Sequence, residues 1–97
     1  MGLVADEPLS EEALRQLETT ISVASPEPWE AFIQEREPIG GCSFIRMGGF
    51  DDSIPDMYVY HEDKIAPAAD LDFIAAARKY MPLLISEVRR LRNLGSS

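Results

Sequence analysis

Apolar residues recur at helical spacing in two stretches of the chain, one near each end. In the first stretch the intervals are three and four residues, and the members are Leu14, Leu17 and Ile21. Ser10 precedes this pattern and is followed by two glutamates. A serine hydroxyl can accept a hydrogen bond from the first turn of a helix, and acids there favour the positive end of the helix dipole. Ser25-Pro26-Glu27-Pro28 stops the pattern, so the sequence predicts a helix over 10–24.

The second stretch is the longest apolar pattern in the chain and has the alternating spacing of a helical seam. Its members are Ile74, Ala77, Met81, Leu84, Val88 and Leu91. Pro82 lies in the middle of the seam and cannot donate a backbone N–H to the preceding turn. The sequence therefore predicts either two helices, about 70–80 and 82–93, or one sharply kinked helix. Gly95 is the expected stop.

A shorter apolar pattern follows the first helix. Pro28 suits the first turn of a new helix over about 28–36, in which Trp29, Phe32 and Ile33 share one face. Trp29 is the only tryptophan. It either anchors this short helix to the core or faces solvent as a binding hot spot.

Two runs in the centre of the chain have the β-branched and aromatic content of strands. They cover 42–47 and 57–61, and they would pair as an antiparallel hairpin across the loop 48–56. Two strands alone are only marginally stable, so the hairpin must lie against the helices or find another strand, which a second chain could supply. The predicted fold is α+β: a small helical domain of three to four helices with one central antiparallel β-hairpin.

The chain has the length and composition of one globular domain. It has 97 residues, of which 45% are hydrophobic, and a disordered chain of this charge would be poorer in apolar residues. The expected organisation is a flexible tail over 1–9, a single domain over 10–94 and a frayed C-terminus over 95–97.

The net charge of −8 is unevenly distributed. Residues 1–40 carry nine acids and two bases, residues 41–70 six and two, and residues 71–97 two and five, which gives −7, −4 and +3. Such a field repels nucleic acid and anionic lipid and speeds encounter with a basic protein. The alternative is that the acidity serves only solubility.

The sequence contains few residues that could act as a nucleophile or a general base in catalysis. Cys42 and His61, the only cysteine and the only histidine, are the one conceivable nucleophile–base pair, and no motif surrounds either residue. We expect Cys42 to be a small buried apolar group and His61 to be a strand-end residue satisfied by solvent or by Asp63. The arginines 89, 90 and 92 are more typical of a solvated helix end than of a nucleic-acid site. The sequence therefore indicates a protein that is not an enzyme.

A metal or cofactor site is not expected either. Five acids lie in and after the central loop, but they lack the alternating ligands, central glycine and final glutamate of a calcium loop: Asp51, Asp52, Asp56, Glu62 and Asp63. The two glycine pairs lack the pattern of a phosphate-binding loop.

The expected location is the cytoplasm. One cysteine permits no intramolecular disulfide, which suits a reducing compartment. The first residues lack the basic start and long apolar core of a secretory signal, and no apolar run approaches the ~20 residues of a membrane span.

Both ends of the chain resemble a family of short uncharacterised bacterial and phage open reading frames. Ala24-Ser25-Pro26-Glu27-Pro28-Trp29 is similar to its Ala-Thr/Ser-Pro-Gly-Pro-Trp element, with Glu27 in place of the usual glycine. The runs 70–78 and 82–92 are similar to its Asp-x-Asp/Glu-Phe-Ile-Ala-x-Ala-Arg and Pro-x-Leu-Leu-x-Glu-Val-x-Arg-Leu-Arg elements. The resemblance brings no activity and no catalytic residues. Some of these reading frames lie in toxin loci or mobile elements, which implies an immunity protein.

The function expected from these observations is non-catalytic binding of a protein. Its most specific form is an acidic immunity protein that occludes the active site of a basic toxin, such as a nuclease. The contact residues would be Asp51, Asp52, Asp56, Glu62 and Asp63. The alternative is a phage or mobile-element accessory protein that self-associates through its C-terminal helices, as a homodimer whose seam is Ile74, Met81, Leu84, Val88 and Leu91.

Overall fold

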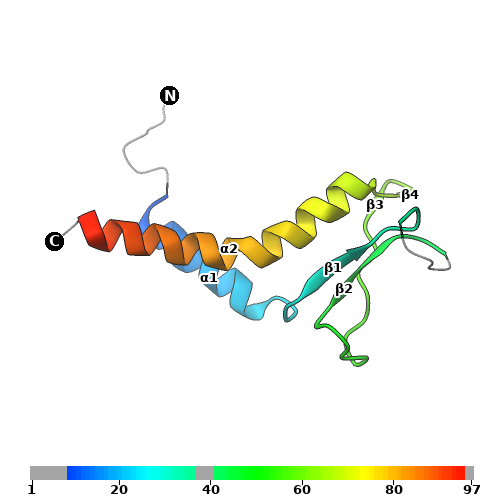
Figure 1. Cartoon of the computed structure of the whole chain (residues 1–97), viewed down its shortest axis with the longest axis horizontal. Coiled ribbons are helices and arrows are strands. Elements are labelled where there is room, and N and C mark those ends of the chain that lie inside the picture. Colours follow the sequence, from blue (N-terminus) through cyan, green and yellow to red (C-terminus); the bar gives the residue numbers. More distant parts are fainter. Residues whose placement is uncertain (1–8, 37–40, 96–97) are drawn as a thin grey trace.

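A computed structural model describes residues 9–36 and 41–95 of the chain. In these residues it contains two helices and four short strands, in the order α1 (Glu11–Val23), β1 (Trp29–Phe32), β2 (Phe44–Met47), β3 (Tyr60–His61), β4 (Lys64–Ile65) and α2 (Ala68–Gly95). The strands form two antiparallel sheets, β1–β2 and β3–β4 (Figure 1). The α+β class is confirmed. The expectation of three to four helices is wrong, because the described part of the chain has two.

The predicted ends of the domain are only partly described. Residues 1–8 and 96–97 lie outside the described residues, so most of the predicted tail and of the predicted frayed end falls there. Gly95 belongs to α2, which extends two residues past the predicted end at 93, and the residues that follow Gly95 lie outside the described residues.

The first helix begins and ends close to the predicted residues. Ser10 is its N-cap, and the serine hydroxyl accepts a hydrogen bond from the Ala13 N–H at 3.0 Å. Two glutamates occupy the first turn, where the helix dipole favours them. Leu14 is the only residue of α1 that is fully buried, so the helix rests on its neighbour through a narrow apolar face.

The segment after α1 is a strand and not the predicted short helix. Trp29–Phe32 pairs antiparallel with Phe44–Met47, with Trp29 opposite Met47 and Phe32 opposite Phe44. A helix of about nine residues is marginal in water, whereas aromatic and β-branched residues favour a strand when a partner strand is available. The pairing with β2 therefore overrides the helical spacing of this segment.

The central strand is β2, and it has a partner on each edge. One edge pairs with β1, and on the other edge Ile45 and Met57 exchange both backbone hydrogen bonds, at 2.9 and 2.8 Å. The predicted hairpin of 42–47 with 57–61 is therefore wrong in its extent, because the two runs meet at one bridge. The chain turns back directly after β3, with Glu62 at a φ of 57°, and β3 pairs with β4 instead.

The C-terminal seam forms one helix with Pro82 inside it, which is the second of the two predicted alternatives. Figure 1 shows the axis of α2 changing direction in its middle, where the colour passes from yellow to orange. A proline inside a helix costs roughly 3 kcal/mol. Leu71 before it and Ile85 after it are both buried, so packing holds the helix on each side of the proline.

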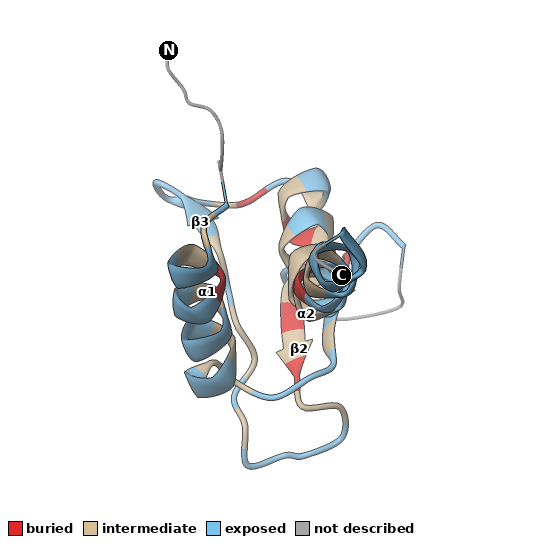
Figure 2. Cartoon of the chain, turned by 90° about the vertical axis from the view of Figure 1, so that its left-hand side faces the viewer, coloured by how far each residue is buried: buried red, intermediate tan, exposed pale blue. Residues whose placement is uncertain are grey.

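The apolar core has two unequal parts. The larger part lies between the sheet and the first half of α2, and it consists of Ile33, Ile45, Met47, Ala66 and Leu71. The smaller part joins the second half of α2 to α1, and its buried residues are Leu14 and Ile85. Among the described elements α1 contacts α2 alone. Figure 2 shows the buried part of α1 on the side of that helix that is turned toward α2.

An arginine on α2 reinforces the docking of α1. The two terminal nitrogens of Arg89 lie 2.5 Å from a Glu18 carboxylate oxygen and 2.6 Å from a Glu11 carboxylate oxygen. The hydrogen bond to Glu18 raises the pKa of Arg89. The helix pair thus combines one small apolar contact with one bridging guanidinium.

Candidate functional site

The face of the β1–β2 sheet that points away from α2 is not covered by either helix. Residues opposite each other in a sheet share a face, and Ala31, Ile45 and Met47 belong to the face that packs in the core. The other face is reached by neither helix, because α2 packs on the core side and α1 contacts α2 alone. We call it the open sheet face, and its residues are Glu30, Phe32, Phe44, Arg46 and Tyr58.

Aromatic rings and one guanidinium occupy the centre of the open sheet face. The rings of Phe32 and Phe44 stack with their centroids 5.3 Å apart, and the Tyr58 ring lies 5.8 Å from that of Phe44. The Arg46 guanidinium lies 5.4 Å from the Phe32 centroid and 3.7 Å from an Asp56 carboxylate oxygen. Tyr58 is 50% exposed. Tyrosine and arginine are the side chains that most often carry the energy of protein interfaces.

The five predicted contact acids do not form one cluster. Asp51, Asp52 and Asp56 lie in the loop after β2, whereas Glu62 and Asp63 lie in the turn between β3 and β4. Figure 1 shows this loop and this turn at opposite ends of the β1–β2 sheet. The structure therefore separates the predicted acids into two groups that lie at the two ends of the sheet.

The acids differ in whether a base neutralises them. Among residues 9–36 and 41–95, six carboxylates form no ion pair: Glu30, Glu35, Asp51, Asp52, Glu62 and Asp63. All six belong to the sheet end of the molecule. The predicted contact acid Asp56 is paired with Arg46. The negative charge near the open sheet face is thus largely uncompensated, while the carboxylates of both helices have partners.

Asp51 also shapes its own loop. One of its carboxylate oxygens accepts hydrogen bonds from the Ser53 N–H at 3.0 Å and from the Ser53 hydroxyl at 2.6 Å. These bonds lower the pKa of Asp51, so its charge is held at neutral pH. Phe50 precedes it and is 95% exposed.

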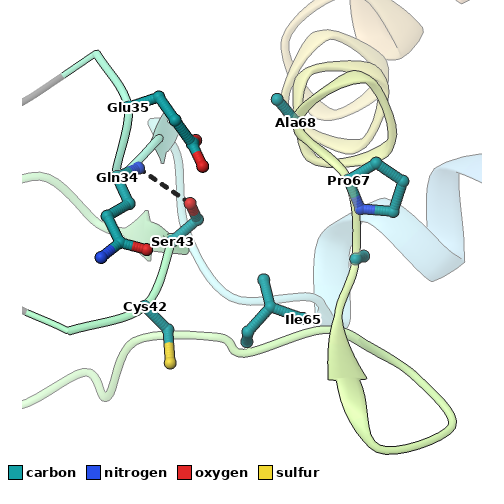
Figure 3. A pocket seen from close by; sticks show the side chains of 8 residues that line it. Gln34, Glu35, Cys42, Ser43, Ile65, Pro67 and Ala68 are labelled. Atoms are coloured by element: carbon teal, nitrogen blue, oxygen red, sulfur yellow. Dashed lines mark hydrogen bonds between the residues drawn. The ribbon is translucent and has the colours of Figure 1, made fainter.

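The predicted burial of the cysteine is wrong, whereas His61 is a strand-end residue as predicted and only its carboxylate partner differs. Cys42 is exposed rather than buried. It lines a hollow of about 220 Å³ with Glu35 and Ser43, and Figure 3 shows its sulfur and the Glu35 carboxylate pointing in different directions. His61 does not line the hollow; its Nε2 lies 2.7 Å from a carboxylate oxygen of Asp70, not of Asp63.

Trp29 serves as an anchor, although on a strand rather than a helix. It is half-buried and packs against the larger part of the core. Its indole N–H donates to the Ser25 carbonyl at 2.9 Å, and the Arg78 guanidinium lies 5.7 Å from the ring centroid. An apolar hollow of about 300 Å³ extends from Trp29 between the two helices.

The predicted dimer seam is divided between the inside and the outside of the molecule. Ile74, Met81 and Val88 are half-buried against the rest of the chain, whereas Leu84 and Leu91 are exposed. The apolar face that remains uncovered on α2 is therefore rotated from the predicted one.

The open sheet face itself was not predicted from the sequence. Phe44 and Arg46 alternate with the buried Ile45 and Met47, so half of the pattern is visible in the chain. The other half, in 28–36, was assigned to a helix, and this assignment hid the alternation of Glu30 and Phe32.

Two further features bear on function. In the part of the chain that the structure describes, no group of three or more histidine, cysteine or acidic residues could hold a metal ion. Neither described helix is long and apolar enough to cross a membrane.

The chain matches no protein-family model, no curated protein and no solved structure.

Proposed function

We propose that this protein is a non-catalytic binding module that holds a basic protein domain against its open sheet face. The observation that carries the proposal is the combination, at the sheet end of the molecule, of an exposed aromatic–arginine centre and six carboxylates that form no ion pair among the described residues. Aromatic side chains supply desolvated contact area, and the acids attract a partner of opposite charge. Both properties serve binding and do not depend on catalysis.

The most specific form of the proposal is an immunity protein that occludes the active site of a basic toxin domain. A nuclease active site is cationic because it binds phosphate, so an acidic inhibitor is steered to it. The resemblance to reading frames found in toxin loci supports the same function. The contact surface proposed now includes Tyr58 in addition to the loop acids Asp51 and Asp52 and the turn acids Glu62 and Asp63.

Co-expression with a toxin tests this proposal. The proposal predicts that a toxin gene immediately precedes the gene of this protein, and the C-terminal domain of that toxin is the probe. Wild-type protein is expected to restore growth, and Tyr58→Ala is expected to bind the purified domain at least about tenfold more weakly, because a central interface tyrosine typically contributes 1–2 kcal/mol or more. Isothermal titration measures the affinity.

Tyr80→Ala is the matched control for this experiment. Tyr80 is 49% exposed, almost the same as Tyr58, but it lies on α2 rather than on the sheet. Its variant should bind the toxin domain with wild-type affinity. Growth arrest that persists with the wild-type protein, or equal losses of affinity for the two tyrosine variants, would contradict the proposal.

A further inference from the structure

A stripe of large apolar side chains follows the outer face of α2. Its members are Phe73, Tyr80, Leu84 and Leu91, and their exposed fractions are 72%, 49%, 58% and 54%. Intervals of seven, four and seven residues place them on one face of the helix, which differs from the face that carries Leu71 and Ile85; Phe73 also borders the hollow between the two helices. Monomeric proteins rarely leave a contiguous apolar surface of this length, about 27 Å, in contact with water.

We propose that this α2 stripe is the interface of an antiparallel homodimer. The intervals between the residues of the stripe are the same when read from either end of the helix, and the midpoint of the stripe is at Pro82. An antiparallel pairing about a two-fold axis at that position places Phe73 of one copy opposite Leu91 of the other, and Tyr80 opposite Leu84. Such an interface is isologous, because each copy offers the same patch to its partner.

The residues beside the stripe permit close approach of the two helices. Ala69, Ala76 and Ala77 flank its first half, and Leu83 and Leu94 flank its second half; the leucines are exposed. Small side chains on one helix opposite large ones on the other allow interaxial distances of about 8–10 Å. Glu87, an acid beside the second half of the stripe, is held by Arg90 one turn later along its own helix.

The charges of the molecule favour the antiparallel orientation. The sheet end carries the six carboxylates without ion pairs, whereas the last turns of α2 carry Arg90 and Arg92. An antiparallel dimer brings the basic end of each α2 toward the acidic sheet end of the other copy, and it also opposes the two helix dipoles. A parallel dimer would place the two acidic sheet ends together, whereas at the other end Arg89 and Arg90 are paired with carboxylates of their own chain.

The size of the stripe sets the expected affinity. Burial of the two aromatic and the exposed leucine side chains removes on the order of 1,000 Å² from water over both copies, which is about the smallest area of a specific interface. The dimer should therefore dissociate in the micromolar range, on the order of 10 μM. It leaves both open sheet faces accessible, so it is independent of the proposed binding of a basic partner.

Sedimentation equilibrium between 5 and 500 μM tests the dimer. Wild-type protein is expected to change from the monomer mass to twice that mass across this range. Leu84→Glu should weaken association at least about 50-fold, because a charge is buried without a partner at the centre of the interface. Val23→Glu is the control, because it also places a glutamate at an exposed aliphatic position of a helix. Val23 is 79% exposed at the end of α1, and this variant should dimerise normally.

The orientation requires a separate measurement. Arg90→Cys in a Cys42→Ser background allows a nitroxide label to be attached on the exposed side of α2 near its end. Double electron–electron resonance then measures the distance between the labels on the two copies. The antiparallel dimer predicts about 25 Å, and a parallel dimer less than about 15 Å. Wild-type protein that stays monomeric at 500 μM would overturn the dimer, and a short label distance would overturn its antiparallel arrangement.

Failure of the dimer and failure of the proposed function are distinguishable. Tyr80→Ala should lose self-association and keep affinity for the toxin domain, while Tyr58→Ala should do the reverse. If Tyr58→Ala abolishes dimerisation, the second copy binds at the open sheet face and the α2 stripe is not the interface.

Discussion

Replacing Ile45 with alanine is expected to lower the free energy of unfolding by about 3 kcal/mol and the Tm by about 15 °C. The side chain of Ile45 is completely buried, and it lies on the central strand, where it faces the larger part of the core. Its backbone also joins β2 to Met57, so a cavity here affects both edges of the strand. Chemical denaturation followed by circular dichroism gives the free energy.

Phe50→Ala provides the comparison for this variant. It removes a larger apolar side chain than isoleucine, but that side chain is 95% exposed, so the change in the free energy of unfolding should stay within about 0.5 kcal/mol. Similar losses for the two variants would show that Ile45 does not lie at the centre of the core.

Leu14→Ala is expected to release α1 from α2 without unfolding the sheet. Leu14 is the only fully buried residue of α1, and α1 contacts no other described element. Truncation of a buried leucine costs about 2–5 kcal/mol, and a 13-residue helix is marginal once it is undocked. The amides of α1 should exchange with solvent about 100-fold faster, which corresponds to about 3 kcal/mol.

Hydrogen exchange resolved by residue measures this effect. Amides of β2 and of the first half of α2 are expected to keep their protection, because the larger part of the core contains no residue of α1. Equal loss of protection in α1 and in β2 would show instead that the molecule unfolds as one cooperative unit.

Local signals in the sequence were sufficient for the helices. Ser10 and the acids after it identify the start of α1, and the spacing of the C-terminal apolar residues identifies α2. The sequence left two alternatives for the segment around Pro82, and the choice of one continuous helix depends on Leu71 and Ile85 finding different partners on the two sides of the proline. Tertiary packing therefore determines that α2 continues through Pro82 as one helix.

The sheet required information that no single segment contains. Residues 29–33 fit a helix face and a strand equally well by spacing, and only the presence of β2 beside them selects the strand. The acids of the candidate site were predicted because charge is visible in a sequence. The aromatic centre between them was not, since it is formed by β1, β2 and Tyr58 from three separate parts of the chain.

The central claim is that charge at the open sheet face, rather than net charge, recruits a basic partner. Two double variants separate these possibilities, because each removes two negative charges. Asp52→Asn/Asp63→Asn removes one carboxylate without an ion pair at each end of the sheet. Glu12→Gln/Glu87→Gln removes carboxylates on the helices that are ionised at neutral pH, since hydrogen bonds to Arg15 and Arg90 lower the pKa of each.

Stopped-flow measurement of the association rate constant with the basic toxin domain at low salt is the most direct test of this claim. The account predicts that Asp52→Asn/Asp63→Asn slows association about tenfold and that the helix variant slows it less than about twofold. Equal slowing by the two variants would mean that the partner responds only to overall charge, and it would contradict binding at the open sheet face.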